Sequence, residues 1–171
     1  PTREDLARID KERPGKGSNG DWTHPHDPDA RITKMKDGRT HLAHKYEHVI
    51  DMDTGAVVAI TIQGADRGDT TTVHNTLEEA RANIAAVAQD PVRRNKLSPT
   101  RELVGDKGYH SNDTLTTLQH ERGLDTCISE PDRGRRHWKD KAAAQKAVYK
   151  NRQRIRSEQG KRLLRKRGEL V

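Results

Sequence analysis

The pattern of apolar and polar positions divides the chain near residue 40. Residues 1–39 hold few apolar positions and several Gly and Pro residues, as in the run Pro14-Gly15-Lys16-Gly17. This composition favours linkers and turns over packed elements. We therefore predict a flexible or irregular segment that contains one short helix, capped by Thr2. From residue 40 onward the apolar positions recur with the spacings of strands and helices.

Two apolar runs, 42–50 and 56–62, flank the sequence Asp51-Met52-Asp53-Thr54-Gly55. Strand-like runs that are separated by a short segment with Asp and Gly predict a β-hairpin. The first run alternates between two sets of side chains, as a strand does. The second run is nearly all apolar, which predicts a strand covered on both faces.

Helical and strand patterns alternate after the hairpin. An apolar stripe from Val73 to Val87 predicts a helix that is capped by Asp69 or Thr70. Two short strands follow, one ending near Val104 and one over 126–129, with a helix between them that ends near Gly123. The sequence therefore predicts an α/β fold with a mixed sheet, in which an antiparallel hairpin is followed by parallel strands and flanking helices.

Composition limits the size and class of the protein. Of its 171 residues, 30% are hydrophobic and 35% are charged, and Phe is absent, so we expect one domain with a modest core. The single cysteine, Cys127, lies in an apolar run and is expected to be a small core residue. One cysteine permits no internal disulfide, and no apolar run is long enough to span a membrane. We therefore expect a cytoplasmic protein.

Basic residues are concentrated near the end of the chain. Between Arg133 and Arg167 there are fifteen Lys or Arg and two acidic residues, whereas the remainder holds eighteen basic and twenty-four acidic residues. Helix-forming residues run through this segment, with a break expected near Gly160. A concentrated basic segment is typical of a surface that binds nucleic acid; a solvated charged helix is the alternative. We thus divide the chain into 1–39, a core over 40–131 and a basic helical segment over 132–171.

One stretch combines an apolar strand with a carboxylate at its end. Leu103 and Val104 lead to Asp106, and Gly108 is expected to let the backbone turn sharply. Good N-cap residues follow at once, beginning with Ser111, so a helix is expected to start there. A carboxylate between a strand and a helix lies where α/β sheets place ligands and chemistry. A turn or capping role for Asp106 is the alternative.

This order of elements, with Asp106 at the end of a central strand, resembles the ribonuclease H-like core of the DDE transposases of bacterial insertion sequences. The likeness covers the chain from about residue 30 and, more weakly, the first 30 residues. It is carried by the following ordered stretches: Lys34-Met35-Lys36-Asp37-Gly38, His41-Leu42-Ala43-His44-Lys45, Val49-Ile50-Asp51-Met52-Asp53-Thr54-Gly55, Gly64-Ala65-Asp66-Arg67-Gly68-Asp69-Thr70, Gly105-Asp106-Lys107-Gly108-Tyr109-His110, Ile128-Ser129-Glu130-Pro131-Asp132-Arg133-Gly134 and Arg167-Gly168-Glu169-Leu170-Val171.

The resemblance implies a metal-dependent enzyme that cleaves and joins DNA. In that family two Asp residues and one Glu hold two divalent ions, and hard oxygen ligands suit Mg²⁺ or Mn²⁺. Asp106 matches the second carboxylate. The first would lie on a strand before the hairpin, where we expect no such strand, and the Glu would follow soon after Val171, because Glu169 comes too early. The resemblance thus implies an internal fragment that is inactive alone, and assembly of two or more subunits on DNA.

Candidate DNA contacts are basic residues near Asp106 and in the basic segment. Lys107 and His110 flank Asp106 and could contact a scissile phosphate, although an ordinary surface turn would explain them equally well. The first choices for contacts with the DNA backbone are Arg133, Arg135, Arg136 and Lys139, followed by Arg152, Arg154 and Arg156 and then by Arg162, Arg165, Lys166 and Arg167.

Several alternatives stay open at the level of sequence. The protein could be a non-catalytic nucleic-acid-binding module, or a metal-dependent nuclease of the same fold. The histidines between His24 and His48 allow a zinc site, although no cysteine pair accompanies them. Trp138 and Tyr149 could stack on an unpaired base, but packing of their helix on the core is the favoured role. Residues of the Asp51 to Asp53 turn and the acids Asp66 and Asp69 are better explained as turn, loop and cap residues.

Overall fold

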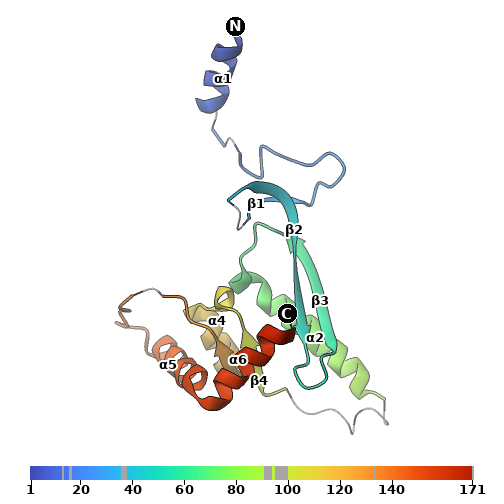
Figure 1. Cartoon of the computed structure of the whole chain (residues 1–171), viewed down its shortest axis with the longest axis vertical. Helices are drawn as coiled ribbons and strands as arrows, with labels where there is room; N and C mark the ends of the chain where they lie inside the picture. The colour runs from blue at the N-terminus through green and yellow to red at the C-terminus, as the bar shows by residue number, and fades with distance from the viewer. Residues whose placement is uncertain are drawn as a thin grey trace. The chain divides into compact units, whose positions relative to one another are not determined.

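The computed structural model describes residues 1–12, 14–15, 17–35, 38–90, 94, 100–132 and 134–170. These residues form two compact units (Figure 1). The first unit consists of Pro1–Tyr46 and Ile62–Arg67, and the second consists of Glu47–Thr61 and Gly68–Val171. Two of the three boundaries run through the strands of the hairpin, and the third lies between Arg67 and Gly68. The basic helices and the strand before Asp106 belong to the same compact unit.

The first unit contains helix α1, Arg3–Glu12, and strand β1, Arg31–Lys34. The expected cap of α1 is confirmed, because the Thr2 hydroxyl accepts a hydrogen bond from the backbone N–H of Asp5. Strand β1 pairs antiparallel with β2, Thr40–Ile50. Our expectation that no strand precedes the hairpin was therefore wrong. The four residues of β1 include no acidic side chain, so this strand carries no candidate metal ligand itself.

The predicted hairpin is confirmed, with β2 joined to β3, Val57–Gly64, and Gly55 at a φ of 74° in the turn. The prediction that the second strand is covered on both faces was wrong. One face of β3 lies against helix α2, Asp69–Ala88, where the hydroxyl oxygens of Thr61 and Thr76 lie 2.7 Å apart. Ile60 on the other face is 59% exposed, so apolar composition alone did not reveal how many faces are covered.

The second unit contains a parallel pair of strands. Strand β4, Glu102–Gly105, pairs in register with β5, Asp125–Ile128. In the described part of the chain, this pair and the antiparallel order β1-β2-β3 are separate sheets. The sequence correctly predicted the antiparallel hairpin and the parallel strands, but the single mixed sheet that we expected is not what the structure shows.

Helices surround the β4–β5 pair. The predicted start at Ser111 is confirmed, since its hydroxyl accepts from the backbone N–H of Thr114. A glycine was expected to separate the two basic helices, but the break is at Ser157. Gly160 instead serves close packing, because a Cβ there would lie 2.0 Å from the backbone oxygen of Arg154. The helices around the pair are α4 (Asn112–Thr116), its π-helical continuation η2 (Thr117–Glu121), α5 (Ala142–Arg156) and α6 (Glu158–Leu170).

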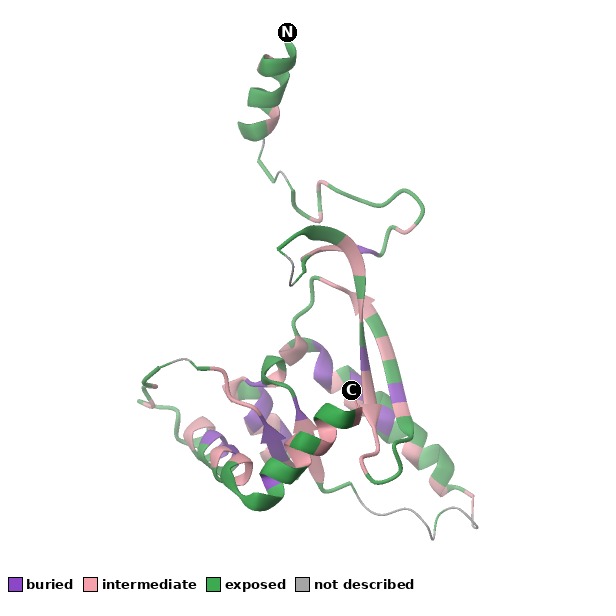
Figure 2. Ribbon diagram, in the orientation of Figure 1, coloured by how far each residue is buried: buried purple, intermediate pink, exposed green. Residues whose placement is uncertain are grey.

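The hydrophobic core of the second unit lies between α4, β5 and α5 (Figure 2). Its fully buried members are Leu115, Leu118, Ile128, Ala147 and Val148. Cys127 is also buried, as predicted. Each buried CH₂ group contributes about 0.8 kcal/mol to the free energy of folding. These few side chains therefore supply most of the apolar packing that holds the helices against the strands. The core thus fixes the strand ends at which Asp106 and Glu130 lie.

Candidate active site

Asp106 lies directly after β4, with φ −74° and ψ 164°, and begins the short 3₁₀ helix η1, Lys107–Tyr109. Its Oδ1 atom accepts a hydrogen bond of 2.6 Å from the backbone N–H of Lys107. Its Oδ2 atom lies 3.6 Å from a guanidinium nitrogen of Arg167 on α6. The side chain is 56% exposed. Asp106 is therefore both a capping residue and an accessible carboxylate at the end of a partly buried strand.

Gly108 lies in a sharp turn and close to a carboxylate. The turn expected at this residue is confirmed, because it lies within the 3₁₀ helix η1, although its φ is not positive. A Cβ at this position would lie 1.9 Å from Oδ2 of Asp69, the first residue of α2, so that carboxylate would have to move if the glycine were replaced. The glycine brings the Asp69 carboxylate against η1, the turn that Asp106 begins.

A buried carboxylate supports the same turn from the hairpin. Glu47 on β2 is 4% exposed and accepts hydrogen bonds from the hydroxyls of Thr72 and Thr76 on α2. Tyr109 at the end of η1 also hydrogen-bonds with Glu47. Burial raises the pKa of Tyr109, and the negative charges of Glu47 and Asp69 raise that pKa further. The tyrosine therefore stays protonated and fixes η1 against α2 and β2.

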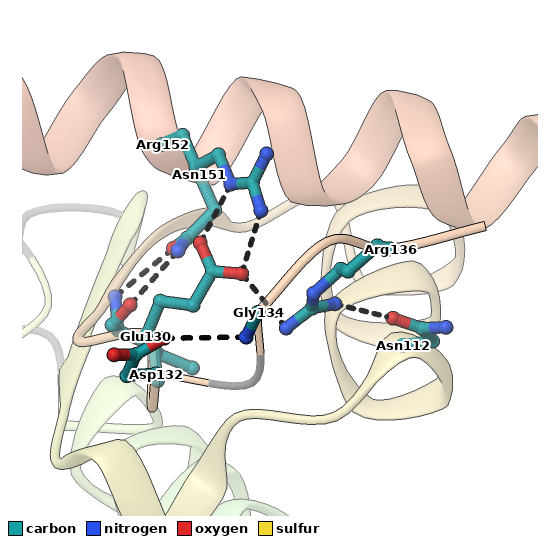
Figure 3. A network of polar contacts seen from close by, with 8 residues as sticks. Asn112, Glu130, Asp132, Gly134, Arg136, Asn151 and Arg152 are labelled. Carbon is teal, nitrogen blue, oxygen red and sulfur yellow. Dashed lines mark hydrogen bonds and ion pairs between the residues drawn. The ribbon is translucent and has the colours of Figure 1, made fainter. Parts of the chain in front are cut away.

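A second carboxylate follows the neighbouring strand. Glu130 comes two residues after β5, and both of its oxygens bind the guanidinium of Arg152, at 2.6 and 2.8 Å. Arg136 approaches the same carboxylate at 2.8 Å and donates to Oδ1 of Asn112 (Figure 3). The side chain of Asn151 hydrogen-bonds with both the N–H and the carbonyl of Ile128. This network ties α5 and the segment after β5 to the end of the strand.

The charge environment of Glu130 is strongly positive. The hydrogen bond from Arg152 holds the pKa of the Glu130 carboxyl below its usual range, with further contributions from the charges of Arg136, Arg152 and His110. His110 is only 1% exposed. The surface position that we expected for this histidine was therefore wrong, and the side chain belongs to the interior beside Glu130.

The basic residues predicted to contact DNA differ in whether the fold already pairs them with carboxylates and in how exposed they are. Three of them, Arg136, Arg152 and Arg154, form ion pairs with carboxylates of the fold. Lys107, Arg135, Lys139 and Arg156 are exposed, as are Arg162 and Arg165 on α6, whereas Lys166 and Arg167 are half-buried and lie near Asp53 and Asp106. Arg133 lies outside the described residues. Acids from β4, β5 and the segment after it thus neutralise part of the basic segment, and within the segment Glu158 pairs with Lys161.

The described residues near Asp106 do not fit a pair of divalent ions. Nowhere in the described part of the chain do three His, Cys, Asp or Glu side chains gather closely enough to hold a metal. Asp106 itself faces the guanidinium of Arg167, and one carboxylate that is paired with a cation supplies too few oxygen ligands. The turn role expected for Asp51 is confirmed, since it accepts from the hydroxyl of Thr54, and this bond holds the pKa of Asp51 below its usual range.

Comparison with protein families adds the decisive observation. The family model described as the transposase DDE domain matches residues 18–169. The chain belongs to this family. No curated protein and no solved structure matches the chain. The resemblance inferred from Gly105 to His110 and the other ordered stretches is thereby confirmed.

Membership in the transposase DDE domain family indicates a role in transposition and a nucleic acid as the substrate. Divalent metal is typical of the family, without an indication of which ion. Among the described helices, none is long and apolar enough to cross a membrane.

Several residues of the site were not identified from the sequence. Glu130 could have been found, because the carboxyl ends of two parallel strands share one edge of a sheet, and Glu130 follows β5 as Asp106 follows β4. Glu47 and Asp69 carried no comparable signal. Their places beside Tyr109 and Gly108 depend on how the hairpin and α2 pack against η1.

Proposed function

We propose that this chain is part of the catalytic domain of a DNA transposase that cleaves and joins DNA strands during transposition of an insertion sequence. In this proposal the domain has a ribonuclease H-like fold, and Asp106 is one of its catalytic carboxylates. The observation that carries the proposal is the position of Asp106, an exposed carboxylate at the end of a parallel strand in a chain of the transposase DDE domain family.

Three further features support the assignment. Asp106 is fixed by its own turn, because Lys107 donates to it and Tyr109 holds the end of that turn against Glu47. Its second oxygen faces a cation, Arg167, which is the type of group that also binds a phosphate. The exposed cations Lys107 and Arg135 remain our proposed backbone contacts, and Mg²⁺ or Mn²⁺ is the expected ion.

The capping role of Asp106 favours one alternative function. A carboxylate that accepts from Lys107 and pairs with Arg167 could be purely structural, and the protein would then be a nucleic-acid-binding module without catalysis. A nuclease without joining activity is the other alternative. Both are outcomes of one experiment, since strand cleavage, strand joining and DNA binding are measured separately.

The test is Asp106→Asn in the complete protein, assayed with labelled element ends and Mn²⁺. We expect cleavage and joining to fall more than about a hundredfold, because even the outer partners of metal ligands cost 10- to 100-fold when they are removed. DNA affinity should stay within about twofold, because the substitution removes no cation. Asp113→Asn is the matched control, an exposed aspartate in the first turn of α4 whose replacement should leave all three measurements unchanged.

Each alternative gives a distinct result. Unchanged cleavage in the Asp106→Asn variant would contradict a catalytic role. Cleavage without joining in the unsubstituted protein would identify a nuclease. Equal losses of binding and cleavage would favour the binding module, in which Asp106 serves the fold of a DNA-binding surface.

A further inference from the structure

The outer face of α5 carries an aromatic ring and two polar side chains in one row. Tyr149, Gln153 and Arg156 are spaced by four and then three residues, so they lie on the same side of the helix. All three are exposed. Together with Arg152 and Ser157 they line an open hollow of about 440 Å³, which is within the size range of small-ligand sites.

The ring of Tyr149 is held in place but remains accessible. It packs against Trp138 with a distance of 6.0 Å between the ring centroids, and the guanidinium of Arg152 lies 5.3 Å from the ring centroid. Arg152 is itself fixed by its two bonds to Glu130. Trp138 packs against the core, whereas Tyr149 is 47% exposed. The two aromatic residues that the sequence analysis considered together therefore have different roles: Trp138 packs on the core, and Tyr149 is accessible to a ligand.

Two polar side chains of the hollow, Gln153 and Arg156, are not engaged by the described part of the fold, whereas Arg152 and Ser157 are. Among the described residues, no carboxylate forms an ion pair with Arg156, although its neighbours Arg152 and Arg154 are both paired. The amide of Gln153 offers both a donor and an acceptor. Ser157 is different, because its hydroxyl already donates to the backbone oxygen of Arg154 and accepts from the N–H of Gly160. An incoming ligand would therefore meet Tyr149, Gln153 and Arg156.

We propose that this hollow binds one unpaired nucleotide of a DNA strand. The base stacks on Tyr149, Gln153 hydrogen-bonds to the edge of the base, and Arg156 binds the adjacent phosphate. An accessible aromatic ring stacks on any base that is not already stacked in a duplex, and a nearby arginine adds charge attraction to the backbone. This inference rests on the proposed function for the identity of the nucleic acid, and it adds a site that contains none of the residues assigned to catalysis.

Duplex DNA and acidic proteins fit the hollow less well. In a duplex both faces of each base are covered by neighbouring bases, so a half-exposed tyrosine would gain nothing from its ring. An acidic protein segment would use Arg156 but would leave Tyr149 without a partner of matching shape. The combination of one ring, one amide and one cation in a row favours a ligand that has a flat ring and an anion close together.

The experiment measures binding of the complete protein to a short single strand that contains one 2-aminopurine, a base whose fluorescence falls when it stacks. We expect Tyr149→Ala to weaken single-strand binding about 5- to 150-fold, as stacking of one base on an aromatic side chain predicts, and to abolish the fluorescence change. Tyr149→Phe should retain both. The matched control is Tyr46→Ala, which removes a more exposed tyrosine on β2, 71% accessible, and should change neither.

Gln153→Ala tests the same hollow from an exposed position outside the core, in case Tyr149→Ala lowers the melting temperature. It should weaken single-strand binding severalfold with unchanged duplex binding. A strand of the same length that is abasic at every position should bind the unsubstituted protein and the Tyr149→Ala variant equally.

Three results would overturn the inference. One is an equal loss of duplex and single-strand binding in Tyr149→Ala. Another is an equal loss for the abasic strand, since the hollow would then accept any polyanion, including an acidic protein segment. The third is a 2-aminopurine fluorescence change in Tyr149→Ala and Gln153→Ala that equals the change in the unsubstituted protein. If the nucleotide-binding tests fail but Asp106→Asn loses cleavage, the proposed function stands without the nucleotide site. If those tests succeed but Asp106→Asn cleaves normally, only the nucleotide site stands.

Discussion

The two faces of helix α5 differ in both composition and role. The inner face buries Ala147, Val148 and Asn151 against β5, and Asn151 binds the backbone of that strand. The outer face exposes Tyr149 and Arg156 to solvent. Burial decides the role of each side chain, because a buried polar group must find a partner within the fold, whereas an exposed one is free to bind a ligand.

The arginines of α5 show the same division over a few residues. Arg152 pairs with Glu130, and Arg154 pairs with Glu102 and with Asp125 at 3.1 Å. These acids lie 22 to 52 residues earlier in the chain than the arginines. A count of charges along the segment therefore overstates the positive charge that DNA would meet. Arg156 belongs to the smaller set that remains available to DNA.

The largest effect is expected from Asn151→Leu, which removes the polar anchor of the inner face. The substitution leaves the buried N–H and carbonyl of Ile128 without their partner, and each such group costs about 1–3 kcal/mol. We therefore expect the free energy of unfolding to fall by about 2–5 kcal/mol in chemical denaturation. Asn75→Leu, at an exposed position of α2, is the control and should change it by less than about 0.5 kcal/mol.

Glu130→Gln should have the next largest effect, because it leaves the guanidinium groups of Arg136 and Arg152 without their shared carboxylate. The two arginine side chains are 13% and 25% exposed. We expect a loss of about 1.5–3 kcal/mol near neutral pH, the range for hydrogen bonds to charged groups. Asp132→Asn is the control, since Asp132 is exposed and bonds only to the backbone of Gly134 in the described network.

The pH dependence of the same variant gives an independent check. The folded-state pKa of Glu130 is depressed, so its contribution is complete above its usual value of 4.5 and is lost as pH falls through the lower folded-state pKa. The difference in stability between the two proteins should therefore be constant from neutral pH down to about 4.5 and then shrink. A difference that did not change with pH would show that the ion pairs do not carry the effect.

The smallest and most selective effects are expected from Arg154→Gln and Arg156→Gln, two neighbouring arginines of opposite role. Arg154→Gln should lower stability by about 0.5–1.5 kcal/mol and leave the salt dependence of DNA binding unchanged. Arg156→Gln should leave stability unchanged and reduce the slope of log affinity for a single strand against log salt by about 0.7. Equal slopes for both variants would show that the two faces do not differ in DNA binding.

The sequence predicted much of the local structure correctly. The hairpin turn at Gly55, the cap at Ser111 and the burial of Cys127 are all confirmed. Each of these depends on neighbouring residues, through a positive φ, a capping hydroxyl or an apolar run. Strand β1 was missed because its four residues, Arg31–Lys34, include only one apolar side chain and its pairing with β2 supplies the rest of its stability.

The candidate site was predicted in part. The position of Asp106 after β4 was predicted because a carboxylate follows an apolar run, whereas its catalytic role remains a prediction. His110 was placed wrongly because a position beside a turn does not reveal burial, and it is 1% exposed. The DNA contacts proposed for the exposed cations remain predictions.

The sequence by itself determined the family resemblance, the total charge and most of the elements of this protein, with strand β1 as the exception. Only the tertiary structure decided which charges remain free, because Glu102, Asp125 and Glu130 meet Arg152 and Arg154 through packing of α5 on the β4–β5 pair. Local pattern is set by interactions between near neighbours along the chain, which a sequence displays directly. The role of a charged side chain depends on partners and solvent access in three dimensions, which only the packed structure defines.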